Sequence, residues 1–516
     1  MSRRTLSWSA VLGMAALLAL PALAAANSQD LEAAEAGKLA ESVGINSMWV
    51  VVAAVLVIFM QAGFAFLEIG FSRGKNVGTV VAKILTNFSI AAICFWAVGF
   101  AIAFGVHDAF GIDGLWGTDG FFLTDYFGHP SPDPGVIPPD GGQAAFPVMG
   151  LSDATVEAKF LFQFAFCAVS LAIVWGTTLE RIKFGVYIIY AIVFASLIYP
   201  LAAGWVFGGG FLQTGDWLGT GIAGMQDFAG STAVHLIGAT GALAVLLLLG
   251  PRRGKYGPDG KPRAIPGHSM PIFGLGVIIL LIGWFGFNPG STLGALDGRF
   301  TEVAAVTLLA AAAGVIFAVI TAAWKTKTID IGMAGNGMIG ALVAITAPSG
   351  YVELWAAPII GAVAGIIVPL GVYAIDKYID DPVGALTAHG LCGVWGTLAC
   401  GLFTAPRLAQ YNAFGNPDGG LFYSGSFAQL IAQAAGILIV FTFVFSMSYG
   451  TFWLIKKVYG LRVSDEEEEA GLDITEHGMY GYPEQFIPAP ELIGYATSPG
   501  SRDVPAPQVT PEEVTT

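Results

Sequence analysis

The sequence feature that most constrains the fold is a series of eleven apolar runs separated by polar breaks. Most are about 20 residues long, the length that an α-helix needs to cross about 30 Å of hydrocarbon. Charged residues make up only 12% of the 516 residues, about half the share in soluble proteins. The runs therefore predict an all-α polytopic membrane protein with eleven transmembrane helices between residues 47 and 457. They lie at 48–70, 83–106, 157–178, 184–207, 228–250, 271–289, 302–323, 331–347, 355–375, 384–403 and 427–455.

The basic residues predict which way the chain crosses the membrane, because cytoplasmic loops carry an excess of Lys and Arg. The segment 107–158 contains neither residue, and Arg299 and Arg407 stand alone in their loops. We therefore expect the N-terminus outside, the C-terminus in the cytoplasm, and a cell (inner) membrane location. The loops after odd-numbered runs hold Arg73, Lys75, Arg181, Lys183, Arg252, Arg253, Lys255, Lys261, Arg263, Lys325, Lys327 and Lys377, and Lys456, Lys457 and Arg462 follow the last run.

The two ends of the chain differ from the apolar middle. Two arginines, a short apolar stretch and small residues spaced A-x-A fill residues 1–26, which is the pattern of a cleaved secretory signal peptide. At the other end we expect a cytoplasmic tail at 458–480 and a disordered, Pro-rich extension at 481–516.

An internal repeat marks two of the runs. DFAGSTAVH ends at His235 and DPVGALTAH ends at His389, and both read D-x-x-G-x-x-x-x-H. The copies lie five runs apart and so enter the membrane from opposite sides, which indicates a five-plus-five inverted repeat followed by an extra C-terminal helix. Eight helical residues advance about 12 Å, so both imidazoles should lie near the middle of the membrane and close together. Asp227 and Asp381 would then cap their helices.

Paired histidines inside a membrane have three readings. Ionisable groups in spans are costly and usually functional, which favours a role in conduction. Two hydrogen-bonded packing histidines are the plainer alternative. A metal site is the third, but only Cys392 offers a nearby further ligand and no H-E-x-x-H is present. We therefore expect no metal and no cofactor.

Several motifs resemble those of the ammonium transporter/Rhesus family, in its Amt branch, over about Ser47 to Tyr480. They are FSRGKN, LERIKF, GWFGFNPGS, DFAG, HGLCG and the tail piece GLRVSDEEEEAGLDITEHG. The resemblance implies a homotrimer with one pore per subunit, not an enzyme. It also implies that His235 and His389 are twin pore histidines, Phe166 and Phe287 gating rings, and Trp284 a pore-lining residue.

The outer substrate site matches the family less closely. The resemblance places Phe166 and Ser291 around an ammonium ion. The repeat itself makes Asp227 as much a candidate substrate ligand as a helix cap. The family's tryptophan before a glycine run is replaced here by Phe207, with Trp205 two residues earlier. We expect Phe207 to occupy the site, and a local backbone shift that brings in Trp205 is the alternative.

The expected function is therefore an ammonium channel that recruits ammonium outside, deprotonates it and conducts ammonia, with or without the proton, past the histidines. An ammonium sensor of the same fold and a membrane metal-binding protein or metalloenzyme are the alternatives. Thr475 is a candidate regulatory phosphorylation site in the tail. A PII-type signal protein is a possible cytoplasmic partner, and the absence of a basic patch argues against nucleic acid.

Overall fold

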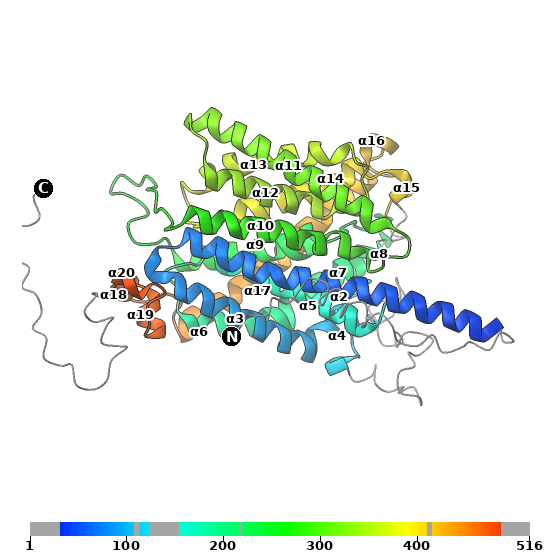
Figure 1. The fold of residues 1–516 in the computed structure, drawn as a ribbon, viewed down its shortest axis with the longest axis horizontal. Coiled ribbons are helices and arrows are strands. Elements are labelled where there is room, and N and C mark those ends of the chain that lie inside the picture. The colour runs from blue at the N-terminus through cyan, green and yellow to red at the C-terminus, as the bar shows by residue number, and fades with distance from the viewer. Residues whose placement is uncertain (1–30, 108–113, 124–153, 216–218, 410–414, 487–516) are drawn as a thin grey trace, which may run out of the picture.

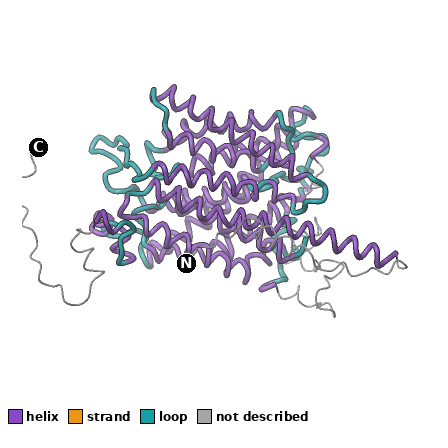
Figure 2. Tube along the Cα trace, in the orientation of Figure 1, coloured by secondary structure: helices purple, strands orange, loops and turns teal. Residues whose placement is uncertain are grey.

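The structure, a computed structural model, describes residues 31–107, 114–123, 154–215, 219–409 and 415–486. The described part consists of helices and loops and contains no β-strand (Figure 2). The long helices run side by side along one direction (Figure 1). They are α2 (Leu31–Phe71), α3 (Val77–Cys94) with α4 (Phe100–Phe104), α5 (Val156–Gly176), α6 (Phe184–Val193) with α7 (Tyr199–Phe207), α9 (Ile237–Leu249), α10 (Met270–Phe287), α11 (Arg299–Thr326), α12 (Ile331–Thr346), α13 (Ala356–Ile375), α14 (Cys392–Phe403) and α17 (Ala428–Val458).

These helices are the eleven predicted membrane crossings. Ten helical stretches among the described residues are long and apolar enough to span a membrane, and α12 is a shorter apolar helix between two of them. The protein is therefore a multi-pass α-helical membrane protein. Many large apolar side chains remain exposed on the outer surface of the bundle, including Leu85 on α3, Ile282 on α10 and Leu438 on α17. Lipid or another subunit would cover such a surface.

Wide π-turns interrupt four of the crossings. Two lie within α3–α4 and α6–α7, at Phe95–Gly99 and Phe194–Ile198. The other two, η8 (Ser231–Leu236) and η11 (Leu386–Leu391), lead into α9 and α14 and carry the two histidines. η8 packs on α14 while η11 packs on α9, which is the reciprocal arrangement expected of an inverted repeat. The extra helix, α17, packs against both α9 and α14.

Residues 459–486 fold back onto one end of the bundle, which we call the tail face; the opposite end is the far face. The short helices α18 (Asp465–Ala470), α19 (Leu472–His477) and α20 (Pro483–Phe486) lie at this end in Figure 1. The segment contacts the loops after α2, α5 and α9. Its bonds run from the Leu472 amide to Asn76 Oδ1 (2.8 Å), from the Lys183 amide to the Leu461 carbonyl (3.0 Å) and from the Arg253 amide to Glu468 Oε1 (2.7 Å).

The boundary expected between tail and extension differs in the structure. The Tyr482 hydroxyl lies 2.9 Å from His268 Nε2, in the loop between α9 and α10, and Pro483–Phe486 form α20. Residues 481–486 are therefore part of the folded segment, because a side-chain contact to a distant loop holds them. The predicted signal peptide at 1–26 and the rest of the extension, 487–516, lie outside the described residues.

Candidate functional site: a column of rings ending at two histidines

The helical segment that carries His235 begins at Ser231, and the side chain of Asp227 caps its start. Asp227 Oδ1 accepts hydrogen bonds from the amides of Gly230 and Ser231, and Oδ2 accepts from those of Thr232 and Ala233, at 2.8–3.0 Å. Four amides that a helix start would leave free are thus satisfied by one carboxylate. Asp227 is 2% exposed. These bonds describe a helix cap, and the substrate-binding role expected for Asp227 stays a prediction.

Asp381 plays the matching part in the second copy of the repeat. Its Oδ1 accepts from the Gly384 amide (3.1 Å) and its Oδ2 from the Leu386 amide (2.7 Å). The two caps therefore start the two π-turned segments from opposite ends of the bundle. Further bonds from Ser170 Oγ to the Val234 carbonyl (2.8 Å) and from Ser231 Oγ to the Val343 carbonyl (2.7 Å) tie η8 to α5 and α12.

The two imidazoles meet in the interior of the bundle. Nδ1 of His235 lies 3.2 Å from Nδ1 of His389, and the ring centroids are 5.2 Å apart with an interplanar angle of 22°. Two nitrogens at this distance share one proton, so one ring donates and the other accepts. His235 is fully buried and His389 is 5% exposed. The closeness expected from the repeat spacing is confirmed.

Aromatic rings continue from His235 toward the far face. Its ring lies over Trp284 and Phe287, at centroid distances of 5.2 and 5.4 Å. Phe287 in turn stacks on Phe166 at 4.0 Å and 8°. The Trp284 indole donates to Thr346 Oγ1 (2.9 Å), which fixes its orientation. We call Phe166, Phe287, His235 and His389, with the flanking Trp284, the ring column.

The far-face end of the ring column is formed by Phe207 rather than Trp205. The Phe207 ring is half-buried and lies 6.4 Å from that of Phe166. Trp205 instead packs on Phe443 at 4.6 Å, and its indole N–H donates to the Leu115 carbonyl (2.7 Å). Ser291 follows Phe287, with its hydroxyl donating to the Phe287 carbonyl (2.8 Å), which leaves its oxygen free to accept.

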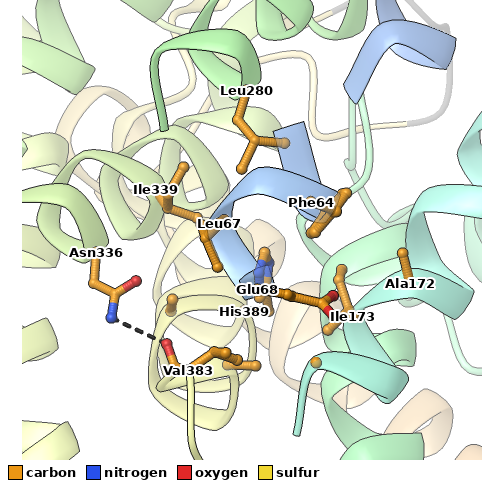
Figure 3. Close-up of a pocket in the computed structure, with 13 residues that line it drawn as sticks. Phe64, Leu67, Glu68, Ala172, Ile173, Leu280, Asn336, Ile339, Val383 and His389 are labelled. Carbon is orange, nitrogen blue, oxygen red and sulfur yellow. Dashed lines mark hydrogen bonds between the residues drawn. The ribbon is translucent and has the colours of Figure 1, made fainter. Parts of the chain in front are cut away.

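The other end of the ring column opens into a small cavity of about 20 Å³ beside His389. Phe64, whose ring lies 6.4 Å from that of His389, lines it together with Leu67, Ile173, Leu280 and Ile339 (Figure 3). Among these mostly apolar walls stand two polar side chains, Glu68 and Asn336 (Figure 3). No sequence signal marks Phe64, Glu68 or Asn336, because a single Phe or a single polar residue in an apolar run forms no motif.

Thr475, the candidate regulatory residue, and Cys392, the further ligand considered for a metal site, both lie outside the ring column. Thr475 lies in α19, within the segment 459–486 that folds back onto the tail face. Its hydroxyl donates to the Gly471 carbonyl (3.0 Å). Within the described residues no three His, Cys, Asp or Glu side chains gather as metal ligands would. Cys392 faces the Ala364 carbonyl, and all four cysteines are free thiols.

Comparison with known proteins decides the family. The model of the Ammonium Transporter Family matches residues 48–482. This chain belongs to the ammonium transporter family. "Ammonium transporter Amt2" of Archaeoglobus fulgidus is 40% identical over 481 residues, which cover 92% of this chain and 96% of that protein. "Ammonium transporter Amt1" of Haloferax mediterranei is 34% identical, with 86% and 80% covered.

Solved structures of the ammonium transporter family share the fold. One named "Sensor Amt Protein" superposes with a TM-score of 0.73 at 34% identity, covering 85% of this chain and 99% of its own. Mep2 of Candida albicans superposes with a TM-score of 0.71 at 28% identity, covering 86% and 91%. The predicted resemblance and the membrane fold are thus confirmed. The family is one of ammonium transporters rather than of enzymes.

Proposed function

We propose that the chain is an ammonium channel in which the ring column is the pore. Ammonium is recruited at the far face, gives up a proton beside Phe166 and Phe287, and crosses as ammonia past His235 and His389 toward the tail face. The observation that carries the proposal is the stack of rings leading without interruption to two paired, buried imidazoles. Membership of the ammonium transporter family supports the choice of substrate.

The apolar walls account for selectivity. An isolated ion in a low-dielectric interior faces a cost on the order of tens of kcal/mol. Removing the proton of ammonium at neutral pH costs only about 3 kcal/mol, at about 1.36 kcal/mol per pKa unit. Sodium and potassium have no proton to lose and are excluded. The imidazole pair offers the released proton a hydrogen-bonded route.

The orientation, assembly and control of the channel complete the proposal. The tail face is cytoplasmic, the N-terminal signal peptide is removed, and three subunits assemble through their exposed apolar helix faces in the inner membrane. Residues 459–486, which include Thr475 and which we call the docked segment, regulate the pore. A phosphate on Thr475 would add about −2 charge next to Glu476, whose carboxylate accepts from the Phe184 amide, and would weaken docking. A PII-type protein at this face would act on the same loops.

Flux in proteoliposomes tests the proposal. We expect wild-type protein to give an ammonium-dependent current or internal pH change that sodium and potassium do not produce. His235→Ala and His389→Ala should each alter flux or ion selectivity while the oligomer, measured by its mass in detergent, persists. Unchanged flux and selectivity in both variants would assign the histidines to packing.

A sensor is the second candidate, favoured by the similarity to the structure named "Sensor Amt Protein". A sensor would bind ammonium with little or no conduction. Ammonium binding measured by calorimetry, without flux in the same preparation, would identify it.

A further inference from the structure

A buried ion pair lies at the inner end of the ring column. Glu68 in α2 contacts Lys83 in α3, and the two side chains are 1% and 0% exposed. Removing two charges from water costs several kcal/mol each, and ionisable groups inside membrane spans are rarely there without a function. Neither the cap residues nor the ring column includes this pair.

The cavity joins the pair to the pore. Glu68 and His389 line the same space of about 20 Å³ (Figure 3). Val383 and Ala385, which precede η11, also line it, so the cavity lies on the tail-face side of His389. Its volume is enough for about one water molecule. Ammonia and ammonium have that size.

One oxygen of Glu68 is free within the described structure. Lys83 contacts Oε2, while Oε1 is buried and has no hydrogen-bond partner. Space in front of Oε1 is kept by Gly176, where an added Cβ would lie 3.3 Å from it. Lys83 Nζ also lies 5.9 Å from the centre of the Tyr187 ring. The groups facing the carboxylate are therefore Lys83, the pore imidazole and, behind the lysine, Tyr187. An acceptor buried without a partner costs about 1–3 kcal/mol, more if charged, unless something binds there.

We propose that this cavity is an inner ammonium site with Glu68 as its acceptor. The inference rests on the proposed function. A proton carried along the imidazoles arrives at His389; the N–H bond of this imidazolium breaks, and the proton forms the fourth N–H bond of ammonia in the cavity. His389 returns to its neutral form, and the new ammonium ion donates to Glu68 Oε1 before it leaves toward the tail face. One positive charge enters and one leaves, while Lys83 keeps the empty site neutral.

Glu68→Gln tests the proposal, since glutamine keeps the shape and removes the charge. We expect the ammonium-dependent current of proteoliposomes to fall about tenfold or more, as for a lost hydrogen bond to a charged group. Ammonia entry, read as the rise of internal pH, should continue. Current equal to that of wild type would overturn the inference.

The double variant Glu68→Gln/Lys83→Met distinguishes an ammonium-binding site from an ion pair that only stabilises the packing of α2 on α3. If the pair only held α2 against α3, two neutral side chains would restore the current that Glu68→Gln loses. We expect no restoration, in protein that elutes from size exclusion like wild type. Restored current would refute the site, as would a folded Lys83→Met variant that loses current as completely as Glu68→Gln. A matched control is Glu302→Gln, a paired carboxylate near the far face, which should stay within about twofold of wild type.

The same measurements keep the two proposals apart. Wild-type protein without any ammonium-dependent current or pH change would refute the channel itself. A wild-type signal that is insensitive to Glu68→Gln would leave the channel standing and refute only the inner site.

Discussion

At the scale of single residues, Phe207 is the ring at the far-face end of the ring column, where we propose that ammonium is recruited. A cation binds the face of Phe less well than that of Trp. We predict that Phe207→Trp strengthens ammonium binding by about 0.5–2 kcal/mol. The measurement is the half-saturation concentration of flux, which should fall. Ser291→Ala should shift it the other way by about 1 kcal/mol, since the hydroxyl oxygen is lost as an acceptor.

Trp205→Phe is the control for this prediction. Because the Trp205 ring packs on Phe443 and its N–H bonds to Leu115, the half-saturation concentration should not change. If the half-saturation concentration changed in Trp205→Phe but not in Phe207→Trp, the ring at the far-face ammonium site would be that of Trp205 and not that of Phe207.

Asp380, in the tail-face loop between α13 and η11, is expected to make stability depend on pH. Burial acts to raise its pKa, but hydrogen bonds to Arg252 and the charges of Arg181 and Arg252 outweigh this and lower the pKa from 3.8 to about 2. The lowered pKa stabilises the fold by about 2 kcal/mol above pH ~4, and this contribution is lost as the pH falls toward 2. Thermal unfolding in detergent should show Asp380→Asn less stable than wild type at pH 6, with the difference shrinking below pH 4. A difference that stays constant down to pH 3 would contradict this assignment.

Residues with a pattern around them were predictable, and isolated ones were not. His235 and His389 stood in a repeat, so their closeness followed from helix geometry. Lys83 was expected at the start of a crossing, because a charge is costly inside the membrane; instead α3 begins at Val77 and Lys83 is buried against Glu68. Only the tertiary structure brings its partner from another helix. Phe64 has no sequence signal at all, since any apolar run contains phenylalanines.

At the scale of elements, Asp473 links the docked segment to a membrane helix. Its carboxylate accepts from the amides of Gly78 and Thr79 (both 2.9 Å), at the start of α3, and from that of Gly481 (3.2 Å). It thus caps α3 from almost 400 residues away. Asp473→Ala should cost about 0.5–2 kcal/mol, the usual loss for a helix cap. The loss of this cap should appear as faster hydrogen exchange in the first turn of α3 and in α19. If the docked segment regulates the pore, the flux should also change.

Glu484→Ala provides the comparison, because Glu484 is an exposed carboxylate in the same segment. It should leave both exchange and flux unchanged. If a variant that lacks residues 458–516 assembled into the same oligomer as wild type and showed unchanged flux, a regulatory role for the docked segment would be contradicted.

Which helices exist was predictable from hydropathy and the placement of Lys and Arg, whereas their internal shape was not. The four π-turns depend on contacts between helices, such as Ser170 to the Val234 carbonyl, that no local sequence rule encodes. The run at 184–207 reads as one straight span, but Phe194–Ile198 widens it. Docking of the tail likewise depends on side chains, Asn76 and Asp473, that are unremarkable in sequence.

At the scale of the whole molecule, the two faces can be told apart chemically. All four native cysteines lie within the helices α3, α5 and α14. The described loops therefore contain no native thiol that would react with a maleimide. Lys261→Cys is exposed on the tail face and Asp418→Cys on the far face. We predict that a membrane-impermeant maleimide applied to intact cells labels only position 418, and that inside-out vesicles show the reverse. Labelling of position 261 from outside would invert the proposed orientation.

The contact between Phe166 and Phe287 has a consequence for rate. Their rings stack at 4.0 Å, which leaves no room for a molecule between them, so the pore that we propose along the ring column is shut in this arrangement. Each passage must wait for the rings to part. Side chains on the surface flip within nanoseconds, but collective motions of packed helices take microseconds to milliseconds, which limits passage to on the order of 10³ to 10⁶ events per second. Such a pore has the turnover of a carrier rather than of an open ion channel, and its rate should rise with temperature far more steeply than diffusion in water.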